Sequence, residues 1–158
     1  MSVRLQAQAL PNLALPAVQP NVSTRIQLVR SDIAQQQAAA IVNAARERSR
    51  HHHGGTLPAP HVIHTVGPIW NGGHRGEPEL LANCYRNYLR PTVEHALASV
   101  AFPGISTGVY GYPKKKATVV GRREVAQFLR ENPWPQLVVF VAFDKAIRRL
   151  YEQGADAA

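Results

Sequence analysis

Short runs of hydrophobic residues recur along the chain and predict five β-strands. In the first run, residues 24–29, apolar and polar residues alternate, as they do in a strand with one buried face. The other runs are almost continuously apolar, which is typical of strands buried on both faces of a sheet. The predicted strands are residues 24–29, 39–43, 61–66, 100–105 and 137–143.

Segments with the apolar spacing of helices alternate with these strands. The longest covers residues 77–98, where Pro91 is expected to kink or divide the helix. Asp32 and Asp144 stand where a short side chain caps the first turn of a helix. Strands that alternate with helices predict an α/β protein whose central sheet is covered on both faces. The predicted helices are residues 33–38, 77–98, 117–130 and 144–151.

The 158 residues are enough for one domain with a single core. Residues 1–21 contain three prolines and many Ala and Gln residues, so we expect a flexible N-terminal arm before a single domain at residues 22–158. Cys84 is the one cysteine, which excludes an internal disulfide and a thiolate zinc cage and favours a reducing, cytoplasmic location. No apolar run is long enough to span a membrane, and we expect no membrane association.

The formal net charge of +8 favours anionic partners, which include nucleotides, nucleic acid and acidic surfaces. The charge does not choose among them, and a solvated surface accounts for most of the scattered basic residues. His51, His52 and His53 are adjacent in a polar stretch. Because neighbouring histidines on a loop rarely converge on one ion, we expect a solvated loop there and no metal site.

The segment at residues 101–113, AFPGISTGVYGYP, carries the clearest candidate chemistry. A predicted strand leads there into a turn rich in glycine and small residues, and a helical pattern follows. Successive small residues let backbone N–H groups point at one spot, which suits a phosphate or diphosphate. An ordinary turn between a strand and a helix is the alternative, and the segment alone does not decide between them.

Several segments resemble the MacroD-type branch of the macrodomain family, whose members bind ADP-ribose, and they occur in the order in which the family has them. The resemblance covers most of the chain from Asp32 onward. It implies a three-layer α/β/α sandwich with a central mixed sheet and an ADP-ribose cleft at the crest of the sheet. The matching segments are Asp32-Ile33, AIVNAA at 40–45, LPAPHVIHTVGPIW at 57–70, Cys84-Tyr85, AFPGISTGVYGYP at 101–113 and VVFVAFD at 138–144.

The resemblance also implies which residues bind the ligand. The Asp32 carboxylate would accept a hydrogen bond from the adenine amino group while the backbone of Ile33 meets the ring; capping of the following helix is the other role open to Asp32. Residues 106–110 would hold the diphosphate with their amides, and Phe143 would stack on adenine unless it belongs to the core. The ligand-binding residues implied are Asp32, Ile33, Ser106, Thr107, Gly108, Val109, Tyr110 and Phe143.

Other polar residues near these motifs have structural interpretations. Asn43 is expected to fix the backbone of the loop that follows it. His64 and Thr65 are expected to be core and scaffold residues, and Cys84 a small buried side chain.

Part of the family pattern is missing from this chain. Arg46 stands where the resemblance implies a second asparagine, and only RERSRHHHGGT separates Ala45 from Leu57. The missing part would include a glycine-rich loop with an aspartate that activates or positions water, one helix and one strand. The sandwich is therefore expected to lack one helix and one strand, and the catalytic residues are unknown.

The first functional hypothesis is a macrodomain that binds ADP-ribose, of the class that hydrolyses mono-ADP-ribosyl esters on proteins or O-acetyl-ADP-ribose. This chain's residues support binding better than catalysis. One alternative is a non-catalytic reader of ADP-ribose. Another is a basic nucleic-acid-binding module, favoured by the net charge. We expect a monomer that binds ADP-ribose or an ADP-ribosylated protein, uses no cofactor and binds nucleic acid weakly at most.

Overall fold

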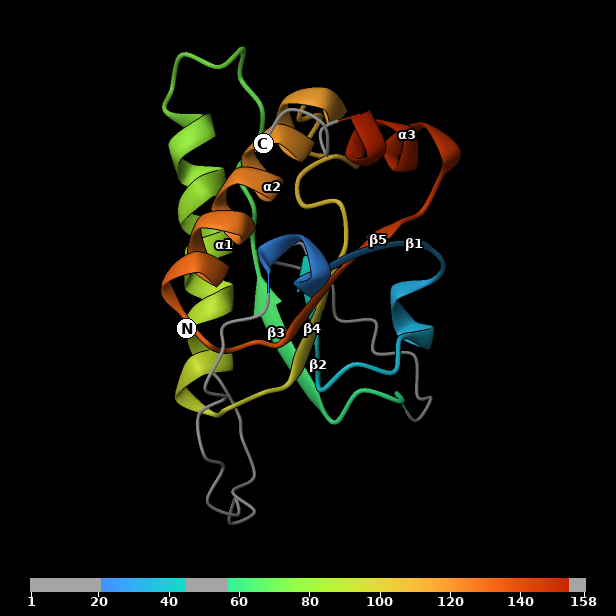
Figure 1. The fold of residues 1–158 in the computed structure, drawn as a ribbon. Coiled ribbons are helices and arrows are strands. Elements are labelled where there is room, and N and C mark those ends of the chain that lie inside the picture. The colour runs from blue at the N-terminus through green and yellow to red at the C-terminus, as the bar shows by residue number, and fades with distance from the viewer. Residues whose placement is uncertain (1–20, 45–56, 154–158) are drawn as a thin grey trace.

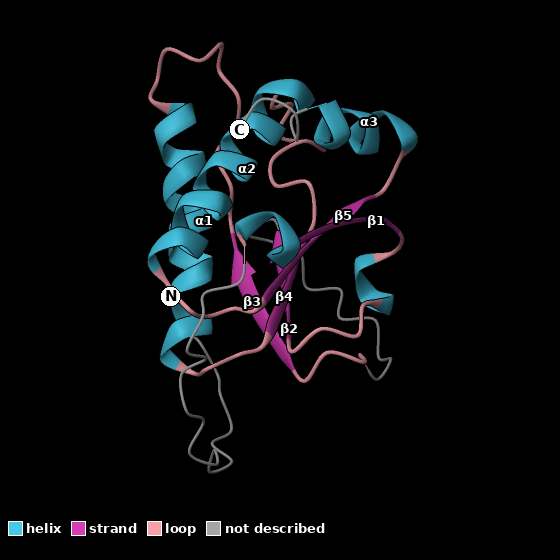
Figure 2. Cartoon of the chain, in the orientation of Figure 1, coloured by secondary structure: helices cyan, strands magenta, loops and turns pink. Residues whose placement is uncertain are grey.

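The computed structural model describes residues 21–44 and 57–153 (Figure 1). Its five strands lie within three residues of the predicted bounds at either end, so the strand predictions are confirmed (Figure 2). The arm expected at residues 1–21, apart from Asn21, and the three adjacent histidines lie outside the described residues. The elements are the 3-10 helices η1 (Val22–Arg25) and η2 (Ile33–Gln35), the strands β1 (Ile26–Arg30), β2 (Ala40–Ala44), β3 (His61–Thr65), β4 (Ser99–Phe102) and β5 (Leu137–Ala142), and the α-helices α1 (Glu77–Glu94), α2 (Lys114–Glu131) and α3 (Lys145–Gln153).

The strands form one sheet in the order β1-β5-β4-β2-β3, and every neighbouring pair is parallel. The α/β class is confirmed. The antiparallel strand that a mixed sheet requires is not found in residues 21–44 and 57–153, because each connection between described strands returns the chain to the same end of the sheet. The carboxyl ends of all five strands therefore lie along one edge, which is the upper edge in Figure 1.

All three α-helices contribute to the larger hydrophobic core, which lies on one face of the sheet. Its centre is a group of aromatic rings from helices and strands. Tyr85 on α1 lies 5.3 Å from Phe102, and Tyr151 on α3 stacks at 4.6 Å on Phe140. Gly121 lets α2 approach this group, since a Cβ there would lie 2.7 Å from the Tyr85 ring.

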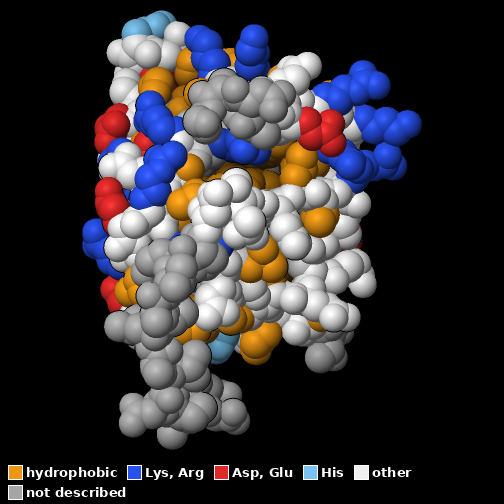
Figure 3. Space-filling model, viewed as in Figure 1, with side chains coloured by type: hydrophobic (Ala, Val, Ile, Leu, Met, Phe, Trp, Pro, Cys, Tyr) orange, Lys and Arg blue, Asp and Glu red, His pale blue; other side chains and the backbone are white. Residues whose placement is uncertain are grey.

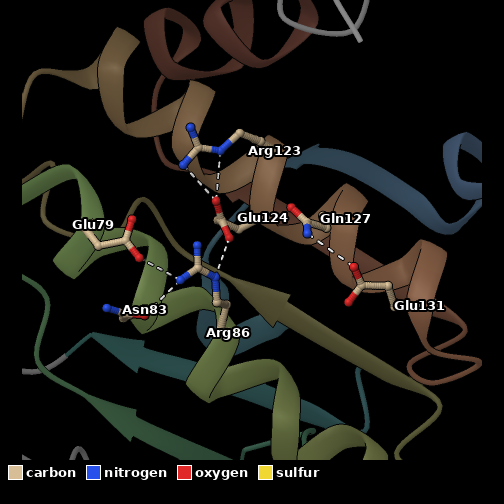
Figure 4. A network of polar contacts seen from close by, with 7 residues as sticks. All are labelled: Glu79, Asn83, Arg86, Arg123, Glu124, Gln127 and Glu131. Carbon is tan, nitrogen blue, oxygen red and sulfur yellow. Dashed lines mark hydrogen bonds and ion pairs between the residues drawn. The ribbon is translucent and has the colours of Figure 1, made fainter.

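A polar network joins α1 to α2 outside this core (Figure 4). Glu124 on α2 is 3% exposed and accepts hydrogen bonds from Arg86 on α1, at 2.7 Å, and from Arg123. Arg86 also forms an ion pair with Glu79, an exposed residue on the same helix. Of the two guanidinium groups on this buried carboxylate, that of Arg86 links the two helices, and that of Arg123 comes from the same helix as Glu124.

The opposite face of the sheet has a smaller apolar cluster that includes Ile41, Ala101, Val139 and Val141. Within the described ranges, the residues packed on this face come from η2 and from the segments around Ala38 and Ala59, and no α-helix lies there. This arrangement agrees with the expectation that the sandwich lacks one helix.

Two helix predictions need correction. The helix expected at residues 33–38 is only the 3-10 turn Ile33–Gln35, because Gln36 is already extended and the chain must reach β2 at Ala40. The helix expected at residues 77–98 ends at Glu94, because Ala96 already has a left-handed φ of 47°. Of the two effects expected of Pro91, division of the helix is ruled out, since α1 continues through it. The cap predicted for the last helix is confirmed, since Asp144 Oδ1 accepts a hydrogen bond from Ile147 N at 2.8 Å. None of the described helices combines the length and the hydropathy that a membrane crossing requires.

Candidate functional site

The strand order creates a crevice between β2 and β4. These strands are neighbours, but the chain continues from β2 to β3 on one side and from β4 to β5 on the other. In parallel sheets such a reversal is where ligands bind, outside the carboxyl ends of the strands. A cavity of about 250 Å³ lies there. It is lined by Ile33, Val42, Asn43, Ala44, Pro103, Gly104, Ser106, Gly108, Val109 and Tyr110.

The β4–α2 loop, residues 103–113, forms one wall of this cavity. Its own hydrogen bonds run from Thr107 N to Gly104 O, from Gly111 N to Gly108 O and from Tyr112 N to Ser106 O. Ser106 has a φ of 63°, which is uncommon for a residue other than glycine.

Several N–H groups of the β4–α2 loop have no acceptor among the described residues. Within the described part of the chain, no hydrogen bond uses the N–H of any loop residue that lines the cavity from Ser106 to Tyr110. Successive backbone N–H groups on the wall of a cavity suit the binding of an anion when no protein atom accepts from them. These donors are the N–H groups of Ser106, Gly108, Val109 and Tyr110.

Two glycines set the shape of this wall. A Cβ on Gly108 would meet no protein atom within 4 Å, so the space in front of this residue is open. A Cβ on Gly67, which follows β3, would lie 2.2 Å from Ser106 Oγ and 2.8 Å from Ile105 Cγ2. Glycine at 67 therefore permits the close approach that positions Ser106.

The residues predicted to bind adenine lie at the ends of β1 and β5. Ile33 lines the cavity, whereas Asp32 and Phe143 do not. Asp32 is exposed and its Oδ1 accepts a hydrogen bond from Ala34 N at 2.9 Å, so its capping role is confirmed. Phe143 directly follows β5 and is 87% exposed, which makes the core interpretation of this residue wrong.

Of the residues predicted in the β4–α2 loop, Thr107 alone does not line the cavity. Its Oγ1 instead donates a hydrogen bond to Gly104 O at 2.9 Å, which stabilises the turn.

The contribution of β2 to the site was not predicted from the sequence. Val42, Asn43 and Ala44 line the cavity opposite the β4–α2 loop. The signal was the polar Asn43 at the end of an apolar strand, but its use required knowing that β2 and β4 are neighbours. His64 is exposed, which contradicts its assignment to the core, whereas Thr65 is buried. Cys84 is half-buried.

Besides Asp32, charged side chains near the site lie at the starts of α2 and α3. Lys114 Nζ lies 2.8 Å from Asp144 Oδ2, which links the end of the β4–α2 loop to the residue after Phe143. The hydrogen bond from Lys114, followed by that from Ile147 N, holds the pKa of Asp144 below its usual value. Lys and Arg side chains gather over α3 (Figure 3), where Lys145, Arg148 and Arg149 are exposed.

Known proteins share both the sequence and the fold of this chain. The family model for the Macro domain matches residues 22–120. The O-acetyl-ADP-ribose deacetylase of Cronobacter turicensis is 50% identical over 99 residues, which cover 63% of this chain and 56% of that protein. The chain thus spans about half the length of the curated relatives that it matches.

Solved structures agree with the family match. An Oceanobacillus iheyensis macrodomain with ADP has a TM-score of 0.76 at 33% identity, covering 82% of this chain and 89% of that chain. A Trypanosoma brucei macrodomain in complex with ADP-ribose has a TM-score of 0.76 at 28% identity, covering 86% and 71% of the two chains. Because the family model matches more than half of its residues, this chain belongs to the Macro domain family.

Proposed function

We propose that this chain binds ADP-ribose in the cavity between β2 and β4. The observation that carries the proposal is the set of four N–H groups, from Ser106 and residues 108–110, that belong to residues lining the cavity and have no acceptor among the described residues. A diphosphate supplies the acceptors that these donors lack, and its negative charge strengthens each hydrogen bond. The relatives with ADP or ADP-ribose in their names support this choice of anion.

The two ends of the nucleotide fall on opposite sides of the N–H cluster in this proposal. Adenine lies toward Ile33, with the exposed Phe143 ring as its platform and with Asp32 as acceptor for its amino group. The second oxygen of Asp32 has no hydrogen-bond partner in the described part of the chain, so capping leaves it available. The distal ribose lies against Val109, 70% exposed, and Tyr110. A cavity of 250 Å³ is smaller than typical small-molecule sites of about 300–1,000 Å³, and it therefore holds the middle of the ligand.

The cavity favours binding over hydrolysis. Hydrolysis of an ADP-ribosyl ester needs a group that orients or deprotonates water. The described residues that line the cavity include no carboxylate, histidine or cysteine. The relatives named as O-acetyl-ADP-ribose deacetylases make hydrolysis the second candidate function.

Calorimetry with ADP-ribose, AMP and a short RNA tests the proposal. We expect ADP-ribose to bind more tightly than AMP and with little dependence on salt. Equal binding of all three, or an affinity for RNA that falls steeply with salt, would instead support a nucleic-acid-binding protein. Release of ADP-ribose from O-acetyl-ADP-ribose, measured beside a full-length relative, decides whether the chain is also an enzyme.

A further inference from the structure

A buried carboxylate organises the β3–α1 loop, residues 66–76, beside the candidate site. Glu77, the first residue of α1, is 1% exposed. Its Oε1 accepts hydrogen bonds from Asn71 N at 2.8 Å and from Gly73 N at 3.1 Å, and its Oε2 accepts one from Arg75 N at 2.6 Å. Three backbone donors on one carboxylate fix the path of the loop.

The negative charge of Glu77 is part of this arrangement. Burial alone would raise the pKa of Glu77, but hydrogen bonds from the backbone N–H groups of Glu77, Asn71, Arg75 and Gly73 outweigh it and lower the pKa to about 2. Glu77 is therefore ionised throughout the physiological pH range. A glutamine at this position would have nearly the same shape but only one oxygen that accepts hydrogen bonds. Its NH2 group would lie against a backbone N–H of the loop, so two donors would face each other.

The β3–α1 loop in turn contacts the β4–α2 loop through Trp70. Trp70 N donates a hydrogen bond to Tyr110 O at 2.9 Å, and Tyr110 lines the cavity. The Trp70 ring lies 4.6 Å from the ring of buried Tyr112, whose N–H donates to Ser106 O. Trp70 also contacts α2, since Lys116 Nζ lies 5.0 Å from the centre of its ring.

The charge of Glu77 also acts on Tyr112. Burial is the first cause that raises the pKa of the Tyr112 phenol, and the negative charge of Glu77 is the second. The Tyr112 hydroxyl is buried and has no hydrogen-bond partner in the described ranges. Packing therefore holds the ring in place, with Trp70 of the loop that Glu77 orders among its contacts.

We infer that Glu77 is a positioning residue for the anion site, acting through Trp70 on the peptide of Tyr110. Holding the Tyr110 carbonyl fixes the peptide that joins Tyr110 to Gly111, which directly follows the run of N–H groups at residues 108–110 and whose N–H donates back to Gly108 O. The inference rests on the proposed function, since it names a residue that sets the geometry of the same site. Glu77 is thus expected to affect binding of the diphosphate and the distal ribose, and not binding of the adenine.

The test compares Glu77→Gln with Glu79→Gln, both made in a Trp134→Phe background so that Trp70 is the one remaining indole. Glu79 is a matched control in the same helical turn, 64% exposed and paired with Arg86. We expect Glu77→Gln to shift Trp70 emission to longer wavelength and to weaken ADP-ribose binding about tenfold or more. We expect AMP binding to change less than about threefold, and Glu79→Gln to change neither measurement.

Two results would overturn the inference. One is a folded Glu77→Gln protein that binds ADP-ribose as tightly as the Trp134→Phe parent; the other is an equal loss for ADP-ribose and AMP, which would indicate a general structural role. If Glu77→Gln does not fold, Gly73→Ala replaces it, because a Cβ there would lie 2.7 Å from Trp70 Cη2 while Glu77 remains intact. The same selective loss is expected. A parent protein that binds no ADP-ribose would refute the proposed function instead, and Trp70 emission would still test whether Glu77 orders the loop.

Discussion

Substituting Gly108 by alanine separates ligand binding from stability. A Cβ at this position meets no protein atom within 4 Å, and the backbone of Gly108 is not in the left-handed region. The added methyl group therefore costs no packing energy. It also restricts the unfolded chain, which favours folding by about 0.4–1 kcal/mol. The free energy of unfolding should stay the same or rise slightly.

Binding should respond in the opposite way. The methyl group occupies space in front of the N–H groups at residues 108–110, where the proposed diphosphate must approach. A lost hydrogen bond to a charged group corresponds to about 1.5–3 kcal/mol, so the affinity for ADP-ribose should fall about ten- to 150-fold. Calorimetry measures this loss, and thermal unfolding shows in the same sample that the fold is intact.

Gly111→Ala is the contrasting variant in the same loop. Its φ of 66° lies in the left-handed region, where a side chain costs about 1–2 kcal/mol, and each kcal/mol lowers the Tm of a domain of this size by about 2–4 °C. Gly111 does not line the cavity. The Gly111→Ala protein should therefore lose less affinity for ADP-ribose than the Gly108→Ala protein. Unchanged ADP-ribose binding by Gly108→Ala would show that no phosphate contacts this loop, and the reasoning would fail.

Further predictions concern stability and pH. Gly67→Ala should lower both the Tm and the ADP-ribose affinity, because its Cβ would collide with Ser106 Oγ and such overpacking costs about 1–3 kcal/mol; a normal Tm would contradict the contact. The pKa of Glu77 is about 2 in the folded protein and 4.5 ordinarily, so its contribution to stability is complete above about pH 4.5 and is lost as the pH falls toward 2. In urea titrations across this pH range, the free energy of unfolding of Glu77→Gln should decline less steeply with falling pH than that of the unsubstituted protein. Arg25→Met should lower the free energy of unfolding by about 2–4 kcal/mol, because buried Arg25 donates hydrogen bonds to three backbone carbonyls, one in the last turn of α2 and two in the segment after it. Urea unfolding measures the loss, and an unchanged midpoint of unfolding would refute the prediction.

The hydrophobic pattern predicted the strands well because burial dictates it locally. The run from Leu137 onward is apolar at nearly every position, and β5 is buried along its length except at its partly exposed first residue, Leu137. The end of β4 was predicted too late, at residue 105, because Ile105 is buried in the loop and not in the strand. Burial is visible in a sequence, whereas the hydrogen bonding that ends a strand is not.

The local sequence pattern indicated only the part of the candidate site that lies within one segment. Glycine and small residues at 106–110 suited an anion-binding loop, whereas Ile33 was expected from the family resemblance alone. The opposite wall, formed by Val42 and Asn43, depends on β2 and β4 being neighbours, although β3 and α1 separate them in sequence. Glu77 could not be recognised either, because an acidic residue at the start of a helix is ordinary. Its burial and its three backbone donors appear only in the folded chain.

The placement of the site explains why binding can be proposed for a chain that departs from its family after Ala45. Every described element of the proposed site comes from the ends of β1 and β2 and from the chain after β4, and these segments pair directly through β5 and β4 in the sheet. The anion donors are backbone groups, so they require a fixed loop conformation and no particular side chain. That conformation is held from the β3–α1 side, by the contact of Gly67 with Ser106 and by the hydrogen bond from Trp70 to Tyr110. Hydrolysis differs physically, because it needs one side chain at one place beside the scissile bond. Loss of a segment can therefore remove catalysis while the geometry that binds the diphosphate is retained.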